Sequence, residues 1–184
     1  YIAHRRDIIV ARSKFDKEKA EKRLSDMNEK DILNDNDYEF LAEIAKSDDM
    51  CIKCDAADLL INYKTKQAVE ILKTLSDDND ATVRASAYDN MWVFEKQDFD
   101  EILRKAVSCE SDGIARSYAI FSLYDLYLQN DCDTAELIDF MHNLYKTEKD
   151  RRCKLQYLRN FYISGETDKL GEIIGYLEDK DYRM

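Results

Sequence analysis

The sequence predicts an all-α fold, an α-solenoid of about four helical hairpins with an N-terminal helical cap. Three observations support this prediction. The 184 residues contain no Pro and four Gly, which argues against a turn-rich β-sandwich or barrel. Apolar residues recur at spacings of three and four, as on one face of a helix. Finally, a pattern of about 31 residues repeats along the chain, and such periods are typical of solenoids.

Each repeat is expected to contain a short first helix and a longer second helix. The basic landmarks Lys53, Arg84 and Arg116 lie 31 and 32 residues apart. In the second unit the first helix is indicated by Ile71, Leu72 and Leu75, and the second by Val83, Ala87, Met91 and Phe94. A single hairpin cannot bury its apolar stripe, so three or more must stack to form a continuous core.

Aspartates mark the expected start of each second helix, because an Asp side chain accepts hydrogen bonds from the free N–H groups of a helix N-terminus. These are Asp49, Asp80, Asp112 and Asp150. Asp133 with Glu136 predicts a capping box at the start of the fourth hairpin. A last helix is expected from Thr167 or Asp168 to about Leu177.

The chain is expected to be a single domain, with residues 1–33 as the N-terminal helical cap and 34–184 as the repeat array. The first segment carries an apolar set that would cover the open end of the first repeat. Its members are Ile2, Ile8, Ile9, Val10, Phe15, Leu24, Met27, Ile32 and Leu33. The alternative is a basic arm that docks elsewhere.

The repeated pattern resembles the HEAT repeat family (armadillo-like α-solenoids) in its short form. The resemblance rests on paired leucines, an Asp and Val-Arg-x-x-Ala, clearest at Asp78 and Val83-Arg84, and it covers residues 38–163. It implies an Asp–Arg ladder between neighbouring repeats. Glu110 with Arg116 replaces Asp with Glu, whereas Ser47 with Lys53 and Lys146 with Arg152 depart from the pattern.

The resemblance also implies that the second helices line a concave surface. Positions one residue beyond the core stripe would then form an aromatic ridge, rich in the residue types of interface hot spots. Its members are Arg84, Tyr88, Trp92, Arg116, Tyr124 and Tyr127. The alternative is that these aromatics pack between adjacent helices.

Acidic turns are expected to stack along one edge of the array. Asp77, Asp78, Asp80, Glu110 and Asp112 would form this acidic edge, suited to a basic partner. Helix capping is the alternative role. The stretch 77–80 lacks the Gly and distal Glu of an EF-hand loop, so no metal is expected there.

Charge narrows the class of partner. The net charge is −11, and residues 31–145 hold 25 acidic against ten basic residues. This repels phosphate, so nucleic acid is an unlikely ligand. No uncharged stretch is long enough to span a bilayer, and no signal peptide is recognisable, so we expect a cytoplasmic monomer without membrane attachment.

No catalytic motif is recognisable, and we expect neither enzymatic activity nor a cofactor. Cys51-x-x-Cys54 has no second ligand pair, and His142 has no nucleophile placed beside it by a motif. The leading hypothesis is a non-catalytic scaffold that binds a basic protein through the aromatic ridge and acidic edge. The alternatives are an acidic immunity or inhibitor protein for a basic toxin such as a nuclease, and a DNA-binding or DNA glycosylase-type protein, which the charge disfavours.

Overall fold

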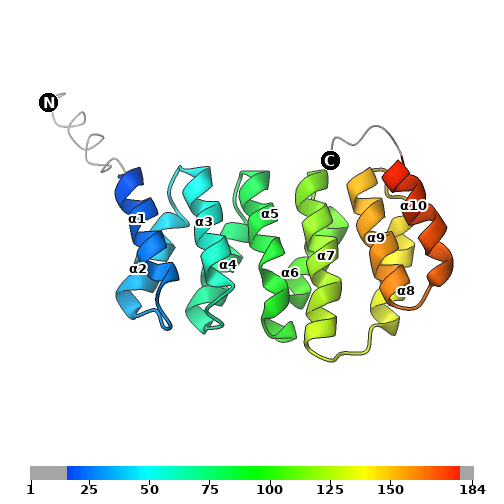
Figure 1. Ribbon diagram of the computed structural model, residues 1–184, viewed down its shortest axis with the longest axis horizontal. Helices are drawn as coiled ribbons and strands as arrows, with labels where there is room; N and C mark the ends of the chain where they lie inside the picture. Colours follow the sequence, from blue (N-terminus) through cyan, green and yellow to red (C-terminus); the bar gives the residue numbers. More distant parts are fainter. Residues whose placement is uncertain (1–15, 179–184) are drawn as a thin grey trace, which may run out of the picture.

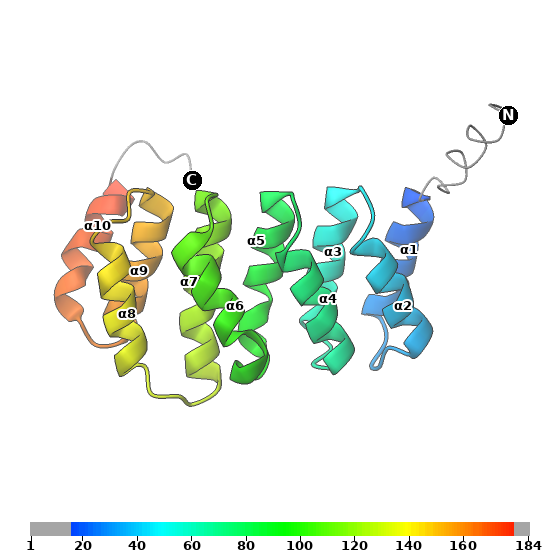
Figure 2. The same cartoon turned by 180° about the vertical axis from the view of Figure 1, so that it is seen from behind.

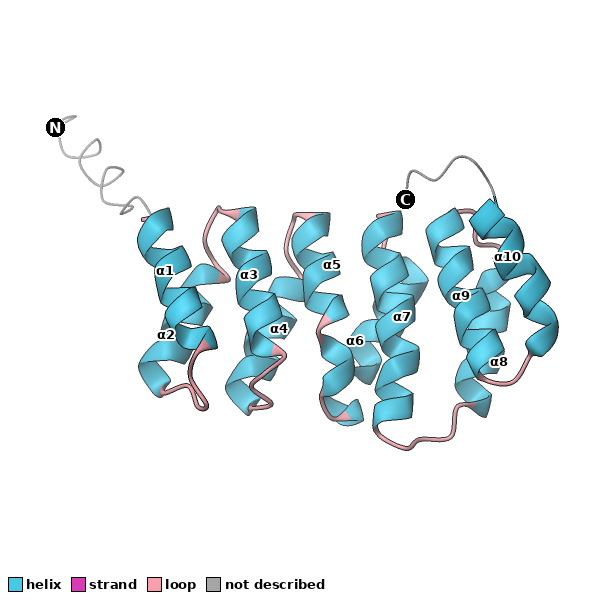
Figure 3. Ribbon diagram, in the orientation of Figure 1, coloured by secondary structure: helices cyan, strands magenta, loops and turns pink. Residues whose placement is uncertain are grey.

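The computed structural model describes residues 16–178, and in that range every regular element is a helix and none is a strand (Figure 3). The all-α prediction is therefore confirmed. The regular apolar spacing and the absence of Pro allow uninterrupted i→i−4 hydrogen bonding through each of these segments.

The helices form two rows (Figures 1 and 2). The front row of Figure 1 holds α1 (Lys17–Asn28), α3 (Met50–Leu60), α5 (Ala81–Asp89), α7 (Gly113–Gln129) and α9 (Arg151–Ile163). The rear row holds α2 (Asp35–Ile44), α4 (Lys66–Ser76), α6 (Lys96–Cys109) and α8 (Ala135–Tyr145). After a 3₁₀ turn at Thr167–Lys169, α10 (Leu170–Glu178) packs against α9.

All four aspartates predicted to start second helices are N-caps. Asp49, Asp80, Asp112 and Asp150 each accept a hydrogen bond from a backbone N–H in the first turn of α3, α5, α7 or α9. The predicted capping box of α8 is different: Thr134 is its N-cap without a side-chain bond, and the Asp133 carboxylate accepts from the N–H of Ala135 at 2.9 Å.

One hydrophobic core runs between the two rows. It extends from Ala20 of α1 to Phe161 of α9, and its largest fully buried side chains include Tyr124, Tyr157 and Phe99. Each helix contributes apolar residues at spacings of three and four. The helices are too short to be stable alone, so this burial supplies most of the stability of the array.

The second unit departs from the expected hairpin. The sequence predicts that its second helix is the longer one, but α4 has eleven residues and α5 has nine. The α-helix ends at Asp89, and a 3₁₀ turn follows at Met91–Val93. The amide of Asn90 donates to the carbonyl of Ser86 at 2.9 Å, which stabilises this end. Met91 remains in the core, as predicted.

The N-terminal cap is described only from residue 16 onward, so its predicted apolar residues from Ile2 to Phe15 lie outside the described range. Within it, α1 packs against α3 through Ala20, Leu24 and Met27. The hydroxyl of Tyr63 donates to the carbonyl of Met27 at 2.7 Å. In the described part of the chain, no helix has the length and apolarity needed to cross a bilayer.

Candidate functional site

Ion pairs join neighbouring hairpins at three successive turns. We call each pair a rung: the basic residue comes from the first turn and a half of one front-row helix, and the acid comes from the turn before the next front-row helix. The rungs are Lys53 with Asp78, Arg84 with Glu110 and Arg116 with Glu148, with N–O distances of 2.7, 2.7 and 3.0 Å.

The rung of Arg84 shows how the contacts are organised. Its Nε and Nη2 donate to the two carboxylate oxygens of Glu110 at 2.7 and 2.8 Å, and its Nη1 donates to the carbonyl of Asp78 at 2.9 Å. Oε1 of Glu110 also accepts the N–H of Asp112 at 2.9 Å. The guanidinium therefore holds the pKa of Glu110 below its usual range. Two turns and one helix start are fixed by a single bidentate contact.

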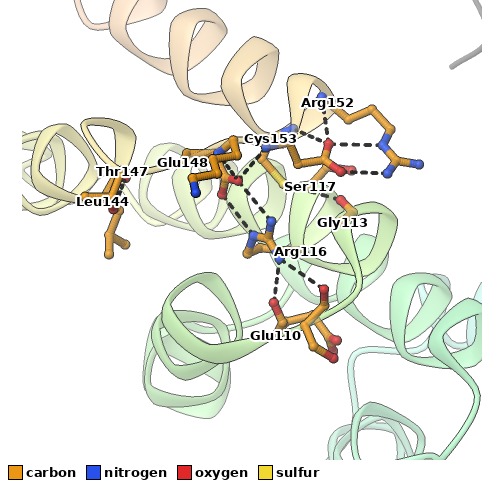
Figure 4. A network of polar contacts seen from close by, with 12 residues as sticks. Glu110, Gly113, Arg116, Ser117, Leu144, Thr147, Glu148, Arg152 and Cys153 are labelled. Atoms are coloured by element: carbon orange, nitrogen blue, oxygen red, sulfur yellow. Dashed lines mark hydrogen bonds and ion pairs between the residues drawn. The ribbon is translucent and has the colours of Figure 1, made fainter.

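The rung of Arg116 repeats this geometry (Figure 4). Its Nε and Nη2 donate to Glu148 at 3.0 Å each, and its Nη1 donates to the carbonyl of Glu110 at 2.6 Å. Oε1 of Glu148 accepts the N–H of Asp150 at 2.8 Å. Burial is the largest influence on the pKa of Glu148 and raises it, but the hydrogen bonds from Arg116 and the turn outweigh burial and lower it.

At the fourth hairpin the sequence-based ladder is wrong in both members. Glu148, not Lys146, supplies the acid of the turn. Arg152 is bonded within its own turn to Asp150, at 2.7 Å, and this bond is the main reason that the pKa of Asp150 is lowered to about 2. Counted from the N-cap, Lys154 occupies the position of Arg84 and Arg116.

Three residues of the predicted aromatic ridge belong to the core. Tyr88, Tyr124 and Tyr127 are 5%, 1% and 4% exposed, so the expectation of an accessible ridge is wrong for them. Burial raises the pKa of Tyr88 to about 12, and its hydroxyl donates to the carbonyl of Ser76 at 3.3 Å. Trp92 is half-buried against the core. The alternative of packing between helices holds here.

Most of the predicted acidic edge is engaged internally. Asp78 and Glu110 are rung acids, and Asp80 and Asp112 are N-caps. Of this set, only Asp77 is exposed with a side chain that forms no hydrogen bond or ion pair within residues 16–178. The structure does bring Asp77, Arg84, Tyr88 and Glu110 together around one open hollow of about 500 Å³. The other carboxylates are committed to structure because each satisfies helix or turn N–H groups.

The exposed surface of the front row lies one residue further around each helix. We define the free face as positions 6 and 9 after the N-cap Asp of α3, α5, α7 and α9, none of which is buried. In helix order these positions hold Asp55 and Asp58, Ser86 and Asp89, Tyr118 and Phe121, and Gln156 and Arg159. The surface thus changes from acidic through aromatic to basic along the array.

The acidic part of the free face is held from neighbouring helices. Oδ1 of Asp58 accepts from the hydroxyl of Ser86 at 3.0 Å and from the amide of Asn90 at 2.9 Å. Asp89 makes no side-chain hydrogen bond or ion pair with any residue between 16 and 178. Burial, followed by the charge of Asp58, raises the pKa of both Asp55 and Asp89. These carboxylates repel one another, and a nearby cation would relieve that repulsion.

The other end of the free face is electrically balanced. Arg159 bonds Asp125 at 3.0 Å, and its guanidinium carbon lies 4.4 Å from the centroid of the Phe121 ring. Burial raises the pKa of Asp125 more than the hydrogen bond from Arg159 lowers it. The unbalanced negative charge is therefore confined to α3 and α5.

The remaining candidates are placed apart from this face or have structural contacts. Nε2 of His142 lies 2.7 Å from Oε1 of Glu166, and its ring stacks on Phe161 with centroids 3.9 Å apart. Burial raises the pKa of the Cys54 thiol, which favours the unreactive protonated form. In the part of the chain that the structure describes, no three His, Cys, Asp or Glu side chains converge as metal ligands would.

Comparisons with known proteins assign no family. No family model and no solved structure matches the chain. Among curated proteins, the match is to a DNA topoisomerase 4 polypeptide of Streptococcus pneumoniae, which is 83% identical over 24 residues. That match covers 13% of this chain and 3% of the topoisomerase polypeptide, so the chain spans only a small fraction of this relative.

Proposed function

We propose that this protein is a non-catalytic scaffold that binds a basic protein partner through the α3–α5 part of its free face. The observation that carries the proposal is the group formed by Asp55, Asp58 and Asp89, on two adjacent helices. Two of the three have raised pKa values, and Asp89 has no partner among residues 16–178. A Lys or Arg of a partner would pair with these carboxylates and strengthen both the encounter and the complex.

We further propose that the two rows of helices are a HEAT-like α-solenoid. The rungs support this because Lys53, Arg84 and Arg116 all stand four residues after an N-cap Asp and all bond an acid of the following hairpin. Such repetition makes each hairpin contact mainly its neighbours, as in quasi-one-dimensional repeat proteins. An extended free face follows naturally from that architecture.

The functional proposal is tested by affinity capture from source lysate with three forms of the full chain. The first is the wild type. The second carries Asp55→Asn, Asp58→Asn and Asp89→Asn. The third is a matched control in which three exposed acids elsewhere are neutralised, namely Asp48→Asn, Asp77→Asn and Glu101→Gln.

We expect a basic protein that the wild type and the control retain and that the free-face variant loses. Elution of that protein should require less salt for weaker variants, because exposed charge pairs are screened. Retention of every captured protein by the free-face variant, with unchanged circular dichroism, would overturn the proposal.

A further inference from the structure

The free face contains a hollow where its acidic and aromatic parts meet. It has a volume of about 370 Å³ and is bounded by α5, α7 and α9. Its walls include the apolar side chains of Ile114, Tyr118, Phe121 and Leu155. Ile114 and Tyr118 are 47% and 41% exposed, so a substantial apolar surface faces solvent here. Water covering such surface is released when an apolar group binds, which favours binding.

The polar groups of the hollow decide the charge of its occupant. Asp89 lies at its edge without a partner among the described residues. Arg152 also lines it, but its Nε and Nη2 donate to the Asp150 carboxylate at 3.1 and 2.7 Å, so its charge is already balanced. The side chain of Gln156 makes no hydrogen bond within residues 16–178, which leaves its amide able to bond a peptide backbone. The net charge that an occupant meets is that of Asp89.

We propose that this hollow is a peptide-binding groove, whose occupant is a segment of the protein partner with a large apolar side chain next to a Lys or Arg. The apolar side chain packs on Tyr118 and Phe121, and the cation pairs with Asp89. The volume is sufficient for one such side chain and its adjoining backbone. The inference rests on the proposed function and specifies the chemistry that the partner presents.

The test uses a displayed library of random dodecapeptides selected on the full chain, followed by fluorescence anisotropy with the enriched peptides as labelled synthetic probes. We expect enrichment of sequences with Leu, Met or Phe within three residues of Lys or Arg. Tyr118→Ala should weaken their binding about tenfold, as for an interface aromatic. The isosteric Asp89→Asn should weaken it roughly fivefold at low salt, with less effect at high salt. Asp55→Asn, which removes one carboxylate of the free face outside the hollow, should change it less than about twofold.

Three results would overturn the groove. The first is enrichment of acidic peptides, and the second is no enrichment. The third is binding that is unchanged by Asp89→Asn and Tyr118→Ala but weakened by Asp55→Asn, which would place the peptide on α3. In that third case the scaffold proposal stands and the groove alone fails, because the lysate capture tests the scaffold independently. Circular dichroism of each variant confirms that the compared chains are folded.

Discussion

At the scale of single residues, the rungs carry the largest local electrostatic stabilisation. The side chains of Arg84 and Glu110 are 17% and 5% exposed, so their pair is screened much less than a surface pair. Both partners of the bidentate contact also have their remaining groups satisfied by turn atoms. Removing one member would leave the other charge desolvated without compensation.

Arg84→Met should therefore lower the free energy of unfolding by about 3 kcal/mol, because Glu110 loses its cation. Urea denaturation at pH 7 measures this. Lys73→Ala is the control, since its pair with Glu70 is exposed and should contribute less than about 0.5 kcal/mol. Equal losses for the two variants would contradict the structural role of the rung.

Asp89 has the opposite relation to stability. Its folded-state pKa is raised, so the folded chain holds the carboxylate proton more tightly than the unfolded chain. The ionised carboxylate thus destabilises the fold at pH values above its folded pKa, and this penalty disappears below the ordinary Asp value.

Asp89→Asn is accordingly expected to stabilise the protein at pH 7 by on the order of 0.5 kcal/mol. The gain should vanish at about pH 3, where Asp89 is protonated in both states. Unfolding curves at the two pH values check this prediction. A loss of stability at pH 7 would show that Asp89 has a stabilising partner and would argue against its role in binding.

At the scale of elements, the caps define where each front-row helix begins. Asp112 is representative: its Oδ1 accepts the N–H groups of Ile114 and Ala115 at 2.8 and 3.0 Å. These donors have no partner inside the helix, and the carboxylate also lies near the positive end of the helix dipole.

Asp112→Ala should cost about 1 kcal/mol of unfolding free energy through the lost cap of α7. Asp112→Asn keeps an accepting oxygen and should recover most of that loss. Thermal unfolding of the two variants makes the comparison. If Ala and Asn gave the same melting temperature as wild type, the N-cap would contribute nothing to the helix.

The caps also explain what the sequence could predict at this scale. Asp80 and Asp112 are recognisable because a capping residue is a local feature, and the apolar periodicity identifies the helices that follow. The early end of α5 could not be predicted, since it depends on the contacts of Asn90 with Ser86 and Asp58. The second of these contacts comes from a different hairpin.

At the scale of the whole molecule, the all-α class was predictable but the predicted binding surface is misplaced by one residue per helix. The core stripe places Tyr88 on the surface, whereas its neighbour Asp89 is the residue that reaches solvent. One residue rotates a side chain by about 100° around a helix. The core stripe shows one boundary of the buried surface, and packing between adjacent front-row helices widens it. Counting from the N-cap Asp, rather than from the stripe, aligns Asp89 with Phe121 and Arg159.

The arrangement of charge is likewise a property of the array as a whole. The sequence shows an acidic middle, but the ion pairs determine which acids remain available. Glu110 and Asp78 are used in the rungs, whereas Asp55 and Asp89 are not paired with a cation among residues 16–178. Docking by a basic partner would therefore depend on α3 and α5 rather than on the acidic turns.

Carbodiimide labelling of carboxylates, read by mass spectrometry with and without the captured basic protein, tests this central claim most directly. The account predicts that the partner protects Asp55, Asp58 and Asp89, while the labelling of Asp48 and Asp77 is unchanged. Protection of Asp48 and Asp77 with unchanged labelling of the free-face aspartates would contradict it.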